Sequence, residues 1–174
     1  MKKLKFILLF ALSIAMLSCG DDDDGGSNEP ELTAAELAGT YNLTFLESTT
    51  EIEETLSTGS TVTTTIEEVG DTFDDSNVVF NSNGTFTTDF QYRITRTTTS
   101  TIEDFETTEE TEIESGSSSG AFSVNEANET VTIAGSIYDI IRFTNSELRI
   151  ELNETSVEND ITETFTEELR FERQ

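Results

Sequence analysis

The sequence of 174 residues contains no histidine, no tryptophan, one cysteine and one proline, and its three lysines all fall within the first five residues. Without histidine, the Ser–His and Cys–His catalytic pairs are excluded, and no lysine is left in the body of the chain for Schiff-base chemistry. Zinc sites built on histidine and cysteine clusters are excluded as well. Carboxylates remain as the groups for general acid–base chemistry. A single cysteine cannot form an intramolecular disulfide, so the fold has to rest on its hydrophobic core.

The chain also has few positively charged residues. From Cys19 onward, six arginines stand against 36 carboxylates, which gives this part of the chain a net charge of −30. A negative field of this size repels the phosphates of nucleic acids and anionic lipid surfaces. Nucleic acid is therefore excluded as a partner. No glycine-rich phosphate-binding loop is present either, and we predict no cofactor.

The first 18 residues have the pattern of an export leader. Met1 to Lys5 form a positively charged flank, and an apolar run follows from Phe6 to Leu17, interrupted only by Ser13. The run is too short for a permanent membrane-spanning helix, which needs about 20 residues. A charged flank before a short apolar run is typical of a cleaved signal peptide, and we predict one at residues 1–18.

The apolar run ends in Leu17-Ser18-Cys19-Gly20. This stretch resembles the lipobox of bacterial lipoproteins, in which an apolar residue and small residues precede a cysteine. The resemblance implies that the leader is cut before Cys19 and that this cysteine carries fatty acyl chains, such as palmitate, that anchor the chain in a membrane. The alternative is an ordinary secreted protein with a leftover thiol.

Residues 19–31 contain almost nothing that can be buried. Asp21, Asp22, Asp23 and Asp24 are followed by glycine, serine and asparagine, a composition typical of a flexible tether. An aspartate run directly after the cysteine resembles the surface-export signal of Bacteroidetes-type lipoproteins. That resemblance implies passage to the outer membrane and exposure on the cell surface. A calcium loop is the alternative, but the run lacks the alternating spacing and the closing glutamate of an EF-hand.

Residues 32–174 have the pattern of one all-β domain. A short helical turn is predicted at 32–37, where Thr33 and Glu36 match a capping box. From Thr40 onward, threonine, valine, isoleucine and phenylalanine dominate and alternate with polar residues, which is typical of half-buried strands. Turn signals at short intervals predict roughly eight to ten antiparallel strands, and no segment has the length and period of a crossover helix.

Alternation also predicts which side chains face inward on the last strand. The apolar residues on one face are Ile161, Phe165, Leu169 and Phe171. Glu163 and Glu167 fall on this same face. A wet barrel mouth is the ordinary explanation for two inward carboxylates. A carboxylate-only glycoside hydrolase is a remote alternative, and it would need such a pair about 5–9.5 Å apart.

Gly39-Thr40-Tyr41 opens the first predicted strand, directly after the helical turn. This start resembles the lipocalin-like family, in which a Gly-x-Trp motif begins the first strand, and Tyr41 stands here in place of the tryptophan. The stretches 79–86 and 138–152 resemble strand–turn–strand segments of bacterial lipocalin-like lipoproteins.

The resemblance covers residues 32–174 and implies an antiparallel up-and-down β-barrel. In this family an arginine from a late strand packs across the aromatic ring and closes one barrel end. The resemblance therefore implies a closing motif of Gly39, Tyr41 and Arg170, with Arg173 as the alternative arginine; the contact is worth about 0.5–2 kcal/mol. Alternatively, Tyr41 is simply a core residue.

An eight-stranded barrel can pack its interior or hold one small ligand. The aromatic residues of this chain have enough volume to fill a small barrel, which favours a packed interior. If a cavity exists, the residues predicted to line it are Phe86, Phe90, Tyr92, Phe122 and Phe165. The predicted function is a non-enzymatic, membrane-anchored lipoprotein of the outer-membrane surface that binds a small apolar ligand. The alternative is a structural or protein-binding lipoprotein that uses its threonine- and glutamate-rich hairpins.

Overall fold

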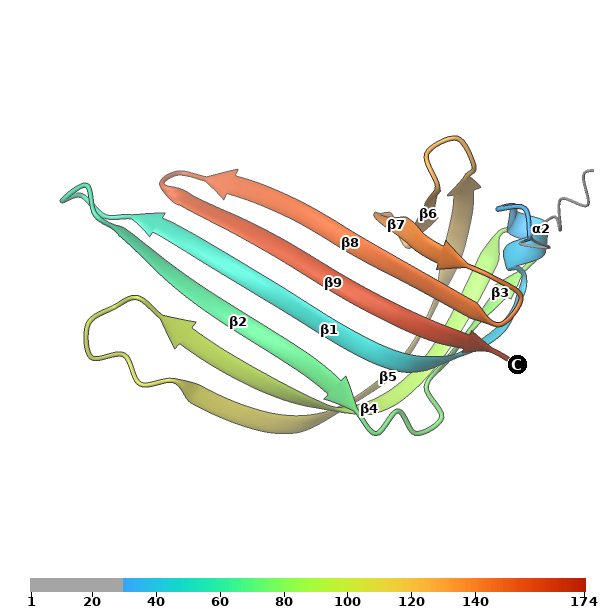
Figure 1. Ribbon diagram of the computed structural model, residues 1–174, viewed down its shortest axis with the longest axis horizontal. Helices are drawn as coiled ribbons and strands as arrows, with labels where there is room; N and C mark the ends of the chain where they lie inside the picture. Colours follow the sequence, from blue (N-terminus) through green and yellow to red (C-terminus); the bar gives the residue numbers. More distant parts are fainter. Residues whose placement is uncertain (1–29) are drawn as a thin grey trace, which may run out of the picture.

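The computed structural model describes residues 30–174 (Figure 1). The predicted leader, Cys19 and the aspartate run 21–24 lie outside the described residues. One short helix, α2 (Ala34–Leu37), precedes nine strands. In chain order the strands are β1 (Gly39–Thr55), β2 (Thr61–Asp71), β3 (Asn77–Asn81), β4 (Thr85–Ser100), β5 (Thr108–Asn125), β6 (Thr130–Ile133), β7 (Ser136–Phe143), β8 (Glu147–Glu158) and β9 (Ile161–Arg173). The prediction of an all-β domain with a short helical turn at its start is confirmed.

The strands form one antiparallel up-and-down sheet that closes into a ring. The sheet order is β2-β1-β3-β4-β5-β6-β7-β8-β9, and β1 also pairs with β9 to close it. β2 and β3 follow one another along the same gap between β1 and β4, and residues 72–76 separate them. The nine strands therefore fill eight positions around the ring.

The helical turn starts where the capping pattern predicts. The Thr33 side chain accepts a hydrogen bond from the backbone N–H of Glu36 at 3.1 Å, which satisfies one of the free donors at the helix start. Leu37, the last residue of the helix, is fully buried. α2 thus lies against one end of the barrel and holds the entry into β1.

Three long hairpins extend beyond the closed part of the ring. In Figure 1 the β1–β2, β4–β5 and β8–β9 hairpins all extend to the left, away from α2. β6 and β7 are short and pair with each other; β6 covers only residues 122–125 of β5, and β7 covers only residues 148–151 of β8. Among the described residues, the outer edges of 108–120 and 152–158 consequently have no strand partner. Glutamates are frequent along both edges, and charge there discourages edge-to-edge aggregation.

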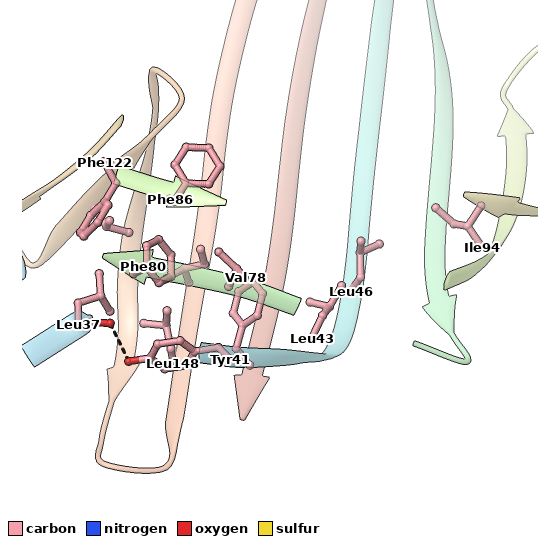
Figure 2. Close-up of a cluster of buried hydrophobic side chains, with 13 residues drawn as sticks. Leu37, Tyr41, Leu43, Leu46, Val78, Phe80, Phe86, Ile94, Phe122 and Leu148 are labelled. Atoms are coloured by element: carbon pink, nitrogen blue, oxygen red, sulfur yellow. Dashed lines mark hydrogen bonds between the residues drawn. The ribbon is translucent and has the colours of Figure 1, made fainter. Parts of the chain in front are cut away.

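The core lies at the α2 end of the ring (Figure 2). Its largest fully buried side chains are Tyr41, Phe80, Leu37, Leu148, Ile150 and Val131. The rings of Phe80 and Phe122 meet edge to face with their centroids 4.9 Å apart, which is a favourable aromatic geometry. The hairpin ends beyond this core are built mainly of threonine and glutamate. These segments can be polar because their side chains have little hydrophobic core to pack against.

Strict alternation along β1 is broken at one residue. Tyr41 and Leu43 face inward, but the register to β9 shifts between Leu43 and Phe45, and Thr44 forms a bulge. Because of this extra residue Leu46 returns to the interior, while Phe45 points outward. The bulge lets the strand bend where the closed end meets the long hairpins.

Candidate ligand cavity inside the barrel

The interior of the ring is not completely filled. A cavity of about 220 Å³ lies between the core and the long hairpins. Six of its lining residues are aromatic: Phe80, Phe86, Phe90, Tyr92, Tyr138 and Phe171. Aliphatic side chains from β1, β8 and β9 complete most of the wall. The interior is therefore not fully packed, although the aromatic content of the chain favours a packed one. One reason is that Phe122 packs in the core against Phe80 and Phe165 lies near the hairpin tips.

Two glycines of β5 allow two of these rings to lie against the wall. Gly116 pairs across the sheet with Phe90, and Gly120 pairs with Phe86. A Cβ atom added at either glycine would lie 2.9 Å or 3.0 Å, respectively, from the facing ring. The rings therefore cover the bare backbone of β5, which leaves space in the centre of the barrel.

The one charged residue that lines the cavity, within the described part of the chain, is Glu167 of β9. The Tyr138 hydroxyl, on β7, donates a hydrogen bond to its carboxylate at 3.2 Å. Burial raises the pKa of Glu167, while the bond from Tyr138 acts in the opposite direction and the charge of Glu68 adds to the rise. Burial also raises the pKa of Tyr138, and the adjacent Glu167 charge raises it further.

A polar layer continues from Glu167 around the inside of the ring. Ser48 of β1 pairs with Glu167 on one side and with Glu68 on the other, and its hydroxyl donates to Glu68 at 3.1 Å. Arg96 of β4 is ion-paired with Glu68 at 2.7 Å and with Glu112 at 2.9 Å. Leu46 and Leu169 form the next pair toward α2. The cavity is thus apolar at its deep end and carboxylate-rich toward the hairpins.

The burial of Glu167 has a consequence for stability. The pKa of Glu167 is higher in the folded protein than the value of about 4.3 in the unfolded chain. Its contribution to the free energy of unfolding is therefore fully present below the unfolded pKa. This contribution is lost as the pH rises through the folded pKa, because the carboxylate then carries its charge inside the barrel. We expect Glu167→Gln to raise the melting temperature at pH 7 by about 2–4 °C. The gain should shrink as the pH is lowered and disappear well below the unfolded value, where the carboxyl is protonated in both states.

Thermal melts of both proteins across this pH range measure the effect. Glu163→Gln is the matched control, because Glu163 has the same inward parity on β9 but is exposed. This variant removes one negative charge from an exposed position, whereas Glu167→Gln removes a charge from a half-buried one. An equal gain in both variants would show that general charge repulsion, and not the burial of Glu167, is responsible.

The predicted lining residues divide into two groups. Phe86, Phe90 and Tyr92 line the cavity. Phe122 does not, because it is buried in the core against Phe80. Phe165 lies further toward the hairpin tips, in a separate hollow beside Glu154 and Glu163. Phe80, Tyr138 and Phe171 line the cavity without having been predicted to do so. Phe80 and Phe171 are among the aromatic residues whose volume favours a packed barrel interior. For Tyr138, the alternation of its strand could have predicted a side chain that faces inward.

The closing arginine on Tyr41 is Arg173, not Arg170. The Arg173 guanidinium lies 5.5 Å from the centre of the Tyr41 ring and donates a hydrogen bond to the carbonyl of Ala38 at 2.5 Å. A Cβ atom at Gly39 would lie 3.0 Å from the Arg173 Nε, so glycine leaves room for this contact. Arg173 pairs directly with Tyr41 in the sheet, whereas Arg170 has the opposite parity.

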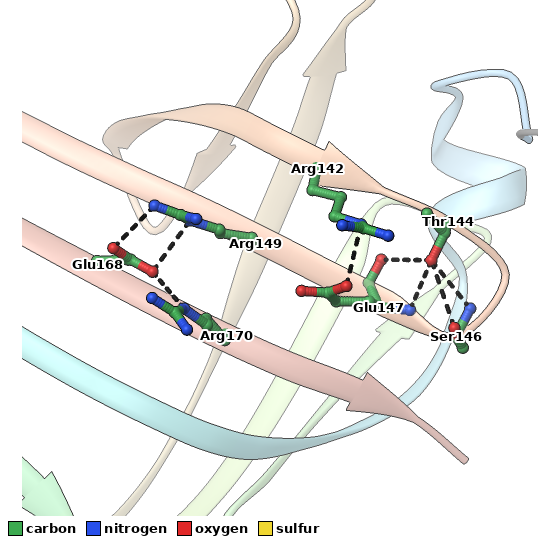
Figure 3. Close-up of polar contacts among 7 residues, drawn as sticks. All are labelled: Arg142, Thr144, Ser146, Glu147, Arg149, Glu168 and Arg170. Carbon is green, nitrogen blue, oxygen red and sulfur yellow. Dashed lines mark hydrogen bonds and ion pairs between the residues drawn. The ribbon is translucent and has the colours of Figure 1, made fainter.

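Arg170 lies on the outer face of the barrel instead. Its guanidinium is 4.1 Å from the centre of the Phe45 ring, and it pairs with Glu168 (Figure 3). Arg149 of β8 pairs with the same carboxylate at 3.0 Å. These side chains form an exterior ion-pair cluster over β8 and β9. They are remote from the cavity because side chains alternate between the two faces of a strand.

The two inward glutamates that sequence periodicity brings to one face do not share a site. Glu167 lines the cavity, and Glu163 lies in the hollow near the hairpin tips. Within residues 30–174, no group of three or more acidic side chains is arranged to hold a metal ion. No helix in the same range is long and apolar enough to cross a membrane.

No family model matches the chain, and no curated protein sequence matches it. Among solved structures, it is similar to Ail, the attachment invasion locus protein of Yersinia pestis, in a complex with the heparin analogue sucrose octasulfate. The match has 8% sequence identity and a TM-score of 0.26, and it covers 79% of this chain and 100% of that one. A match of this TM-score carries no functional conclusion.

Proposed function

We propose that this chain is a lipid-anchored protein of the cell envelope whose barrel holds a small, largely apolar molecule. The observation that supports binding is the 220 Å³ cavity, which is lined by six aromatic side chains and one convergent polar pair, Tyr138 and Glu167. Apolar walls with a few placed polar groups are the usual composition of a small-molecule site. The three long hairpins leave the carboxylate-rich side of the cavity facing the open end of the barrel.

The anchoring part of the proposal rests on the sequence. An acylated Cys19 would hold the chain at a membrane, and the acidic tether at 19–31 would separate the barrel from its surface. The aspartate run supports a position on the outside of the outer membrane by its resemblance to a surface-export signal. A strongly negative barrel would also be kept away from anionic lipid headgroups by repulsion.

A cavity-filling substitution tests the binding proposal. Thr88 of β4 lines the cavity, and its neighbour Thr87 is exposed on the outside of the same strand. We expect a soluble form that starts at residue 20, and so lacks Cys19, to bind the neutral fluorophore N-phenyl-1-naphthylamine, with an increase in its emission. Thr88→Phe should weaken binding at least tenfold because the new ring occupies the space.

Thr87→Phe is the matched control, since it adds the same ring outside the barrel. It should bind the fluorophore as the unchanged chain does. If the unchanged chain fails to bind, or if both variants bind equally well, the cavity is not a binding site for apolar molecules.

A second candidate function is supported by the hairpin tips. Leu56, Ile102, Phe105 and Val157 are exposed there, on three neighbouring hairpins at one end of the barrel. Exposed apolar side chains at one end of a molecule can contribute to a protein-contact surface. In this alternative the barrel is a rigid support and the hairpins contact a protein partner. Failure of the fluorophore experiment would favour it.

A further inference from the structure

We propose that the molecule held in the barrel is a small organic cation, an amine carried on an apolar body, whose charge pairs with Glu167. This inference rests on the proposed function of the cavity and specifies its ligand. It follows from three features of the described residues: the aromatic wall, the position of Glu167 and the location of every arginine.

The aromatic wall suits both parts of such a molecule. Phe80, Phe86 and Phe171 form apolar surface that would bury a hydrocarbon or ring. Phe90 and Tyr92 lie together with their ring centroids 5.6 Å apart, and Tyr138 lines the cavity with Glu167. The faces of aromatic rings attract cations, and this attraction strengthens where water is excluded.

Within residues 30–174, no arginine forms an ion pair with Glu167. Arg96, the arginine of the polar layer, forms ion pairs with Glu68 and Glu112 instead. The other five arginines also have partners elsewhere. Four form ion pairs: Arg93 with Asp71, Arg142 with Glu147, Arg149 with Glu151 and Glu168, and Arg170 with Glu168. The fifth, Arg173, packs on the ring of Tyr41. Tyr138 donates a hydrogen bond to Glu167 but supplies no positive charge. A bound ammonium group would compensate this half-buried carboxylate.

The same charges disfavour an anionic guest. The head group of a fatty acid at this end of the cavity would lie beside Glu167 and near Glu68, and like charges at short range repel. The described residues carry six arginines and 31 carboxylates, a net charge of −25. A field of this sign raises the local concentration of cations and lowers that of anions. Charge selection therefore acts both on approach and inside the cavity.

Three probes with one carbon skeleton separate charge from apolar burial: 3-phenylpropylamine, 3-phenylpropanol and 3-phenylpropanoate. Each is titrated by calorimetry into the soluble form that starts at residue 20, at pH 7 and low salt. We expect the amine to bind at least about tenfold more tightly than the alcohol, and the carboxylate to bind most weakly, because a charge-assisted contact in a partly buried site has this order of strength. Glu167→Gln should bring the amine down to the affinity of the alcohol, and Glu163→Gln should leave the preference intact.

A measurement on the unchanged chain guards against misfolding of the variants. Lowering the pH protonates Glu167 while the amine stays charged, so the affinity for the amine should fall and that for the alcohol should stay constant. The groups that face Glu167 are Tyr138, Tyr92 and Glu68, and none of them supplies a positive charge at acidic pH. Equal affinities for amine and alcohol, or a preference that survives Glu167→Gln, would overturn the cation inference while leaving the proposed function standing. Failure of all three probes and of the neutral fluorophore would overturn both.

Discussion

Replacing Tyr41 with alanine is expected to lower the free energy of unfolding by about 3–5 kcal/mol. Tyr41 is fully buried, and it meets Phe80 edge to face with centroids 5.9 Å apart. Its hydroxyl donates to the carbonyl of Leu37 at 3.0 Å, which ties α2 to the first strand (Figure 2). The substitution would leave a large void at the closed end and remove the platform for Arg173. Burial raises the pKa of Tyr41, opposed by Arg173, so the hydroxyl stays neutral and remains a donor.

Two further variants divide this effect into its parts. Tyr41→Phe keeps the ring and removes only the hydrogen bond, so a loss of about 1 kcal/mol is expected. Phe45→Ala removes an aromatic ring from the outer face of the same strand, where it packs under Arg170, and should cost clearly less than Tyr41→Ala. Urea unfolding followed by circular dichroism measures all three. A loss below about 1 kcal/mol for Tyr41→Ala would show that the α2 end does not hold the barrel together.

The second large effect is expected at the predicted anchor. In a bacterial host, Cys19→Ser should move nearly all of the protein out of the detergent phase of a two-phase separation, because a hydroxyl takes no thioether-linked lipid. Two or more acyl chains hold a protein at a bilayer almost irreversibly, and each buried methylene contributes about 0.8 kcal/mol. Removing the chains therefore removes nearly the whole membrane affinity.

Intact-mass measurement provides the control for this experiment. The unchanged protein should begin at Cys19 and carry the extra mass of its acyl chains, whereas the serine variant should carry none. Ser18→Ala is a matched substitution one residue earlier that keeps a small side chain, and it should leave anchoring intact. A serine variant that still partitions with detergent as the unchanged protein does would contradict lipidation at Cys19.

Much of the fold could be predicted because a strand reveals its faces through a period of two. The inward set Phe86, Phe90, Tyr92 and Ile94 on β4 is placed by alternation alone, and so are Leu148, Ile150 and Leu152 on β8. The helical turn follows from the Thr33 cap. The bulge at Thr44 could not be predicted, because a single extra residue in an extended strand leaves no mark in the sequence pattern.

The candidate site was predicted only in part. Alternation brings Glu167 to the inward face but does not distinguish it from Glu163, which has the same parity. Their burial differs because of β7. This strand covers the barrel beside Glu167, where the Tyr138 hydroxyl bonds to the Glu167 carboxylate. β7 does not extend along the barrel as far as Glu163. Which strands end early is decided by the pairing of distant segments. The same reason explains why Phe165, predicted to line the cavity, lies outside it.

By itself, the sequence of this protein determined that strands dominate, that each strand has one apolar face, and that the chain is intensely acidic with very few arginines to offset it. These are local and additive properties, so reading along the chain is enough to find them. Only the tertiary structure decided that β2 and β3 share one place in the ring, that Arg173 rather than Arg170 covers Tyr41, and that a cavity remains around Glu167. Register and ring closure depend on contacts between residues far apart in the chain, and the space inside a barrel depends on how all of its inward side chains pack together.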